Sequence, residues 1–589
     1  MELIPGTIKS ASLWPFFDQK QVERGLAFAV RTQSIYNCRM TAGHRFKHWI
    51  PHHRQMPASL NDVANIVKAA REFTAVDRLD YGDHGLLEVL DTVSSAIEQN
   101  KRIALYADYD VDGTMSCVSW IWFFNAIGYR NYIHYIPCRF KEGYGVNLSA
   151  IQYLVDQEKA DVVITMDTGI TANLEAEWCR KKGVTFICTD HHKVQPDKMP
   201  DCLILNPKLH PDPNYQELCG CGITFVLLRK LAQHLQNYKI DNEVWTDILA
   251  LTGMATICDV VPLNGVNHKL AKMGIEALMR SKRPILAKLR QAAQITTTDE
   301  KDVGFKLGPR INAVGRLEHA DVVINAFLNE DPTDLIAHMN SANERRRMIQ
   351  STIIEEAQTK AQSLLSEPIV FLGGDWHPGV VGIAASKIAE THWKPTWLFQ
   401  RKDGICKGSA RSIRGFDVTA AMLSCSDLFT KCGGHAAAGG FSFEEKNEDA
   451  IRQRLAAFAI EARSQQPKIW ESAISYDCAL PEHLINLNIL NTLETLKPFG
   501  HSFEEPKFRL SGKISRVDFY NDKQTGQKKH TCIYLRVGNE DHKILFFNDV
   551  LSELNPNAPY SFIVSLSRNS FRGKTSLTIN GYDWAQEAQ

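Results

Sequence analysis

The stretch IALYADYDVDGT, residues 103–114, decides the fold. It begins with a short apolar run of β character, and Asp108, Asp110 and Asp112 follow directly at alternate positions. Residues 114–127 then have the apolar pattern of a buried helix. A buried strand that passes through an acidic loop into a helix is typical of an α/β domain, in which strands alternate with helices.

The same succession continues through residues 100–330. Strand-like runs lie at 133–136, 162–166 and 185–189, and a helical pattern occupies 172–182. Strands that alternate with helical crossovers predict a doubly wound parallel sheet.

Further acidic and histidine residues follow the later strands. VVITMDTGI contains Asp167, FICTDHH contains Asp190, His191 and His192, and TICDVVPL contains Asp259 in another apolar context. Ligands of open α/β sheets bind at the carboxyl ends of the strands, so the clusters that follow the three strands are expected at one edge of the sheet.

Carboxylates crowded at one edge repel each other unless a cation lies between them. Mg²⁺ and Mn²⁺ prefer carboxylate oxygens, and imidazole suits the softer Mn²⁺. Two such ions can activate water and stabilise the leaving oxygen of a phosphodiester. The sequence therefore predicts a shared site for divalent metal ions, Mn²⁺ or Mg²⁺, at this edge of the sheet.

An EF-hand calcium loop is the alternative interpretation of Asp-x-Asp-x-Asp-Gly. Position 12 of such a loop would be Ser119 rather than a bidentate glutamate, and a strand precedes the motif. Both features disfavour the EF-hand.

Length and composition bound the remaining possibilities. The 589 residues exceed a single core of roughly 250–300 residues, so several domains are expected. Lysine plus arginine and aspartate plus glutamate both number 67, so a nucleic-acid site must be a local groove. The apolar runs are too short for a membrane span, the N-terminus (MELIPGTIKSASLW) lacks an export leader, and the 14 scattered cysteines suggest reduced thiols. We therefore expect a cytoplasmic protein without a membrane segment.

Composition shifts divide the chain into five parts. A long helix is expected at 331–366, with Asp331 as N-cap, Pro332 in the first turn and Pro368 beyond its end. Short strand-like runs after residue 470 predict a small β-barrel. The predicted parts are 1–95, of unclear role; 96–330, the first α/β domain; 331–366, the connecting helix; 367–465, a smaller α/β domain; and 470–585, the barrel.

Four motifs in this order, DYDVDG, MDTGI, TDHH and ICDVVPL, resemble those of the DHH phosphoesterases. PCRFKEGYG at 137–145 and GPRINAVGRLEHA at 308–320 are similar to the RecJ branch of that superfamily, and GGHAAAGGFS at 433–442 resembles its DHHA1 domain. The C-terminal strands lie where RecJ carries an oligonucleotide-binding (OB) fold.

The resemblance implies an enzyme of DNA repair and recombination. It would be a single-stranded-DNA-specific 5′-to-3′ exonuclease that releases 5′-mononucleotides. It would act as a monomer, with a helicase and a single-strand-binding protein as possible partners.

The resemblance also implies roles for individual residues. Asp167 would bridge two metal ions, His192 would contact the scissile phosphate, and Asp108 and Asp190 would be ligands or would orient the other groups. The remaining implied metal ligands are Asp110, Asp112, His191 and Asp259. The implied DNA or phosphate contacts are Arg139, Tyr144, Arg310, Asn312, Arg316, Ser409, Arg411, Gly433, Gly434 and His435, with the residues around Asn312 expected in a loop.

Two other functions are compatible with parts of the sequence. Other DHH enzymes hydrolyse short oligoribonucleotides, cyclic dinucleotides or pyrophosphate, but they are usually shorter and lack the barrel. A catalytically dead DNA-binding scaffold would have lost motif carboxylates, which are all present here.

Residues 1–95 do not match the RecJ leader, although they contain basic and aromatic clusters at 44–47 and 52–54. They are expected to cover the cleft, bind a partner or form a surface layer.

Overall fold

The computed structural model describes residues 45–522, 525–556, 558–571 and 574–587. The N-terminal sequence in which we expected no export leader, and His44, lie outside these residues. The chain forms two compact units. Among the described residues, the barrel unit contains residues 45–58, Glu471–Ile485 and the chain from Lys507 onward, and the α/β unit contains Ser59–Trp470 and Asn486–Pro506.

The first sheet of the α/β unit has five parallel strands in the order β3-β2-β4-β5-β6. The strands are β2 (Ile103–Ala107), β3 (Tyr132–Tyr135), β4 (Val162–Met166), β5 (Thr185–Thr189) and β6 (Leu203–Leu205). This order confirms the predicted doubly wound sheet. The chain reverses its direction of winding between β2 and β4, which is the switch point where ligands of such sheets bind.

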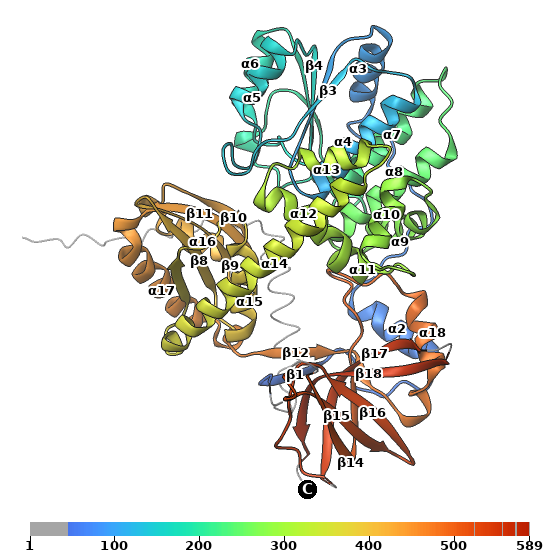
Figure 1. Ribbon diagram of the computed structural model, residues 1–589, viewed down its shortest axis with the longest axis vertical. Helices are drawn as coiled ribbons and strands as arrows, with labels where there is room; N and C mark the ends of the chain where they lie inside the picture. Colours follow the sequence, from blue (N-terminus) through green and yellow to red (C-terminus); the bar gives the residue numbers. More distant parts are fainter. Residues whose placement is uncertain (1–44, 523–524, 557, 572–573, 588–589) are drawn as a thin grey trace, which may run out of the picture. The chain divides into compact units, whose positions relative to one another are not determined.

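Both faces of this sheet are buried, which explains the continuous apolar runs. Ile103 and Leu105 of β2 pack in the core that contains α4 (Val111–Ala126). Ala104 and Tyr106 face the opposite core, which contains residues of α6 (Asn173–Lys181). Helices therefore cover the sheet on both sides (Figure 1).

Residues 308–320, expected as a loop, instead form helix α12 (Gly308–Leu317) after the π-helical turn η4 (Val303–Leu307). The glycines serve close packing rather than a turn. A Cβ on Gly308 would lie 2.4 Å from Cys258 Sγ, and one on Gly315 would lie 2.8 Å from the Tyr109 carbonyl oxygen. Pro309 is tolerated because it lies in the first helical turn.

The predicted long helix is present as α14 (Thr333–Ala361), which is shorter than the expected range 331–366. The Asp331 side chain accepts a hydrogen bond from the Thr333 amide at 3.2 Å, but Pro332 occupies the N-cap position. A 3₁₀ turn, Gln362–Leu364, follows the helix well before Pro368. Within the α/β unit, α14 packs against both α12 and α15 (Val381–His392).

The second sheet has the order β10-β11-β9-β8-β7, with only β7 and β8 parallel. Its strands are β7 (Val370–Gly374), β8 (Thr396–Lys402), β9 (Ile405–Arg411), β10 (Lys431–His435) and β11 (Ala438–Glu444). Residues of α17 (Glu448–Gln465) contribute to its core. This is the smaller, glycine-rich α/β region expected from the sequence.

The barrel unit confirms the predicted C-terminal barrel. Its strands are β14 (Phe508–Asn521), β15 (Lys528–Val537), β16 (Glu540–Phe546), β17 (Pro559–Phe571) and β18 (Lys574–Gln586). Pairing of β14 with β17 closes the barrel. Strand β1 (His48–Pro51) pairs in parallel with β12 (Ala473–Tyr476), and Trp49 Nε1 donates to Asp583 at 2.7 Å. The described part of the N-terminal basic and aromatic segment therefore packs within this unit.

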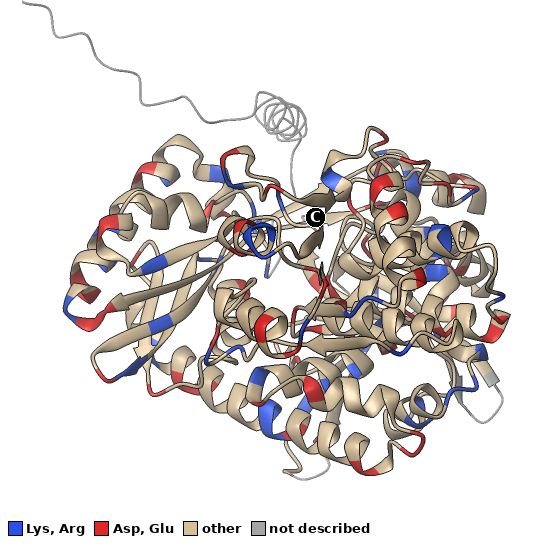
Figure 2. Ribbon diagram, turned by 90° about the horizontal axis from the view of Figure 1, so that it is seen from above, with Lys and Arg blue, Asp and Glu red and all other residues tan. Residues whose placement is uncertain are grey.

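Basic and acidic residues are interspersed along the chain rather than segregated (Figure 2). Across the described residues, none of the helices combines the length and the apolar character that a bilayer span requires.

Candidate active site

The acidic clusters meet at the switch point of the parallel sheet, as the sequence predicted. Three sets of side chains place their potential metal-binding atoms within 4.8 Å of one another. The sets are Asp108, Asp110 and Asp167; Asp112, His191 and Asp259; and Asp167, His191 and His192. Asp167 and His191 each belong to two sets, so the sets form one continuous site.

Backbone amides hold Asp110 and Asp112 in place. Asp110 caps α4 by accepting hydrogen bonds from the Asp112 amide at 2.9 Å and the Gly113 amide at 3.2 Å. Asp112 is fully buried and accepts from the Gly220 amide at 2.6 Å and the Cys221 amide at 2.8 Å. Gly220 and Cys221 begin α7 (Gly220–His234), whose N-terminal dipole favours an anion. The motif thus begins a helix that follows a strand, which is not the EF-hand arrangement.

The backbone is strained beside two of the acids. Asp167 has φ 59°, and so has Val260, which follows Asp259 at the end of α8 (Asn242–Cys258). A non-glycine residue in this region costs about 1–3 kcal/mol and persists only where the surrounding structure imposes it. Two such residues at one site indicate that the surrounding structure fixes the backbone there.

The His191 imidazole lies among the carboxylates. Its Nε2 is 3.0 Å from Asp167 Oδ1, 3.5 Å from Asp259 Oδ2 and 3.7 Å from Asp112 Oδ2. Burial, reinforced by the charge of His192, lowers the pKa of His191 to about 3, so the ring is neutral and able to bind a metal. Nε2 and the buried Asp108 Oδ1 have no hydrogen-bond partner among the described residues. Buried polar atoms without partners are costly, and a divalent cation would satisfy both.

The carboxylates cannot all be charged at neutral pH without a cation. Burial, with repulsion from neighbouring carboxylates, raises the pKa of Asp108, Asp167 and Asp259 well above the usual range. The same causes raise the pKa of Asp112 to about 6. These residues therefore fit divalent metal ions.

Asp190 orients His192. Its Oδ2 accepts from the Ile170 amide at 2.9 Å, and its Oδ1 lies 2.7 Å from His192 Nδ1. Both oxygens are engaged by protein donors, which favours the orienting role over that of a metal ligand. Burial lowers the pKa of His192, but the hydrogen bond and charge of Asp190 outweigh it, so the pKa is raised. His192 Nε2 is 2.8 Å from the hydroxyl of Tyr144, which is half exposed.

Three of the predicted phosphate contacts form an arginine cluster: Arg139, Arg316 and Arg411. Arg411 donates to Ser409 Oγ at 2.6 Å, and Arg139 lies over the Tyr109 ring at 5.1 Å. Burial, together with the charge of Arg139, lowers the pKa of Arg316 to about 10. Within the described residues, none of the three forms an ion pair with a carboxylate. Unpaired cations beside the acidic site suit an anionic ligand.

Asn312 and Arg310 lie on different faces of α12. Asn312 Oδ1 accepts from the Val111 amide at 3.1 Å and so supports the acidic loop. Arg310 donates to Asn340 Oδ1 at 2.8 Å and thus faces α14 rather than the acidic loop.

Gly434 and His435, at the end of β10, line a cavity of about 530 Å³ together with Tyr144 and His192. Gly433 precedes them, and a Cβ there would meet open space. The structure therefore brings the DHHA1-like segment beside the imidazole that Asp190 orients.

The two backbone amides that hold the Asp112 carboxylate, those of Gly220 and Cys221, were not predicted from the sequence. We call this pair of hydrogen bonds the clamp. Its only signal was a glycine pair at 220 and 222 that opens an apolar helix. A Cβ at Gly220 would lie 2.8 Å from Asp167 Cβ and 3.0 Å from Asp112 Oδ2. We expect Gly220→Ala to weaken metal binding and to destabilise the protein by about 1–3 kcal/mol through overpacking.

Calorimetric titration with Mn²⁺ and thermal melts test this expectation. Gly222→Ala is the matched control, because its Cβ would meet the flexible Leu218 side chain at 3.2 Å. Equal metal affinity in both variants would contradict the clamp.

Known proteins share this domain organisation. Residues 102–255 match the DHH family N-terminal domain, residues 362–461 the DHHA1 domain and residues 476–583 the RecJ OB domain. The single-stranded-DNA-specific exonuclease RecJ of Bacillus subtilis is 31% identical over 87% of this chain, which spans only 65% of that protein's length.

RecJ of Thermus thermophilus is 31% identical over 85% of this chain and 71% of its own length. The crystal structure of T. thermophilus RecJ in complex with Mn²⁺ matches with a TM-score of 0.78 and 26% identity, over 92% of this chain and 80% of that one. The similarity extends through the α/β domains and the barrel, and on this evidence the chain belongs to the RecJ family of DHH phosphoesterases.

Proposed function

We propose that this protein is a metal-dependent exonuclease that degrades single-stranded DNA from its 5′ end and releases 5′-mononucleotides. The observation that carries the proposal is the convergence of five aspartates and His191 at the switch point, where buried His191 Nε2 and Asp108 Oδ1 have no hydrogen-bond partner among the described residues. The relatives named as single-stranded-DNA-specific exonucleases support the choice of substrate.

The acidic site would hold two Mn²⁺ or Mg²⁺ ions, and bound ions would activate water and stabilise the leaving oxygen. Asp167 belongs to two of the ligand sets and would be shared between the ions, and Asp108 would complete the set through its free oxygen. The remaining ligands would be Asp110, Asp112, His191 and Asp259.

The other residues of the site would bind and orient the phosphates. His192, held by Asp190 and with a raised pKa, would donate a hydrogen bond to an oxygen of the scissile phosphate. Arg316 and Arg411, with the Ser409 hydroxyl, would receive the 5′-phosphate in a bidentate manner. A pocket of this kind fixes polarity, because it accepts a chain end.

Family membership alone supports the proposed cellular role. The protein would act as a monomer in the cytoplasm, in DNA repair and recombination. It would work beside a helicase that supplies single strands and a single-strand-binding protein that coats them.

Digestion of end-labelled oligonucleotides tests the activity. With Mn²⁺ or Mg²⁺ we expect mononucleotides from the 5′ end of 5′-phosphorylated single strands, no cleavage of blunt duplex and no product with EDTA. Arg411→Lys should reduce the preference for 5′-phosphate over 5′-hydroxyl by roughly tenfold, because lysine cannot form the bidentate contact.

Turnover of dinucleotides or short RNA, with long DNA left intact, would instead assign the chain to the small-substrate enzymes of the superfamily. An unchanged 5′-phosphate preference in Arg411→Lys would remove this arginine from the end pocket.

A further inference from the structure

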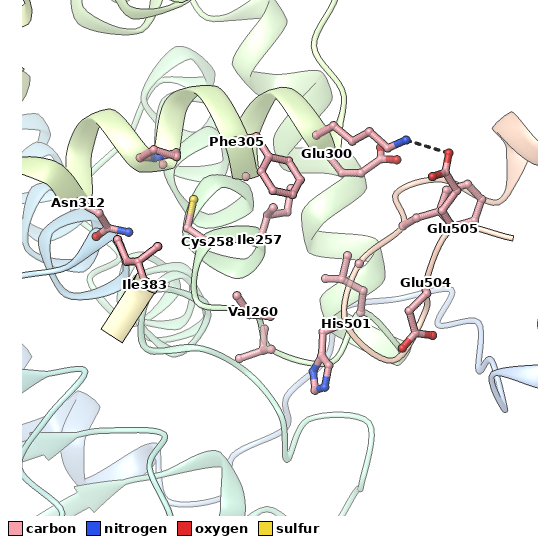
Figure 3. Close-up of a pocket in the computed structure, with 18 of the residues that line it drawn as sticks. Ile257, Cys258, Val260, Glu300, Phe305, Asn312, Ile383, His501, Glu504 and Glu505 are labelled. Atoms are coloured by element: carbon pink, nitrogen blue, oxygen red, sulfur yellow. Dashed lines mark hydrogen bonds and ion pairs between the residues drawn. The ribbon is translucent and has the colours of Figure 1, made fainter. Parts of the chain in front are cut away.

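A groove of about 650 Å³ opens in the α/β unit (Figure 3), and it is lined by Cys258 and Val260, the two residues that flank Asp259 in the sequence. Its walls come from the end of α8, the turn η4, the start of α12, Ile383 of α15 and residues 499–505. Asn312 and Arg316 line it as well. Asn312 supports the acidic loop and Arg316 belongs to the arginine cluster, so the groove is continuous with the proposed active site.

Two apolar side chains of the groove are unusually exposed. Phe305 is 78% exposed and Val260 is 61% exposed. Phe305 projects from the π-helical turn η4, a distortion that occurs frequently at functional sites. Val260 is the β-branched residue with positive φ among the described residues, and it directly follows Asp259. Core packing explains neither the exposure nor the strain.

The charges of the groove disfavour a phosphate backbone along its far end. Lys301 forms an ion pair with Glu505 at 2.8 Å, and the buried Glu300 lies 3.9 Å from Lys497. The exposed Glu504 adds a negative charge. At this end the groove therefore offers an apolar surface to its ligand rather than a track of cations, whereas Arg316 and Arg346 line its other part.

We propose that the groove receives unpaired nucleobases from the strand on the 3′ side of the scissile phosphate, with a base stacked on Phe305 against Val260. This inference rests on the proposed function. Base–aromatic stacking tolerates any sequence because every base has a π face. Paired bases within a duplex cannot present that face, so the groove contributes to single-strand preference.

The test combines Phe305 variants with abasic substrates. A series of 5′-phosphorylated single strands carries one abasic residue, placed at successive positions from the 5′ end. For the wild-type protein, KM should rise when the abasic residue occupies the groove. For Phe305→Ala, KM for intact DNA should rise roughly tenfold, more than kcat falls, and the positional effect should disappear. Phe305→Trp should keep both wild-type properties.

Two further variants complete the design. Val260→Gly removes the side chain and suits the positive φ, so it should raise KM without lowering the melting temperature. Ile460→Ala, on α17 and also exposed, should behave as the wild type.

The outcomes separate the two proposals. Absence of metal-dependent DNA cleavage by the wild-type protein would overturn the proposed function and this inference with it. An active wild-type protein, with unchanged KM and positional profile in Phe305→Ala and Val260→Gly, would overturn the groove alone.

Discussion

Asp167→Asn is expected to lower kcat/KM on single-stranded DNA by roughly a thousandfold or more, because it removes the carboxylate that we propose is shared between two metal ions. The same change should raise the melting temperature of the metal-free protein. Burial and repulsion from Asp112 raise the pKa of Asp167, so the neutral amide relieves an unfavourable charge. Asparagine also tolerates the φ of 59° at this position.

Steady-state cleavage assays and melts with and without Mn²⁺ measure both effects. Asp201→Asn is the control, since the Asp201 side chain is 90% exposed and should tolerate the change without effect. An Asp167→Asn protein that retains activity, or whose melting temperature still rises with Mn²⁺ as in the wild type, would exclude Asp167 as a shared ligand.

Removal of the metal is expected to abolish cleavage, and restoration should depend steeply on pH. Asp112 has a pKa of about 6 in the folded protein against an ordinary value of 3.8. As pH falls through 6 the metal-free carboxylate takes up a proton, which a metal ion must displace. Apparent Mn²⁺ affinity should therefore fall by up to about tenfold per pH unit below this value for each proton displaced.

The raised pKa of Asp112 also determines how the stability of the metal-free protein changes with pH. A raised pKa stabilises the metal-free fold at low pH, and this contribution is lost as pH rises from 3.8 through about 6. A bound metal ion offsets the cost of burying the charged Asp112 carboxylate. The rise in melting temperature on adding Mn²⁺ should therefore grow between pH 5 and pH 7.5. At 100 times Kd the stabilisation is about 2.7 kcal/mol. A pH-independent increase would indicate that Asp112 is not a ligand.

The sequence predicted the elements whose signals are local. β2, β4 and β5 lie at the expected residues because strands buried on both faces require uninterrupted apolar runs. The convergence of Asp108, Asp167 and His191 followed from one rule about parallel sheets.

Features that depend on contacts between residues far apart in the sequence could not be predicted from local sequence patterns. The residues around Asn312 were expected in a loop, but they form helix α12, in which Gly308 and Gly315 allow close contacts with Cys258 and Tyr109. The amides that hold Asp112 come from a helix more than 100 residues later. The exposure of Phe305 depends on a π-helical turn that hydrophobic periodicity does not distinguish from an α-helix.

The parallel pairing of β1 with β12 has a consequence for the order in which the protein is made. The Lys47 amide bonds to Ser472 Oγ, 425 residues further along the chain, and the Arg45 amide bonds to Asp583, 538 residues further. At ribosomal rates of about 5–20 residues per second, β1 is synthesised roughly 20 s to almost two minutes before these partners exist. During that interval the α/β domains can fold as they emerge, while β1 stays unpaired at least until β12 (Ala473–Tyr476) has been synthesised.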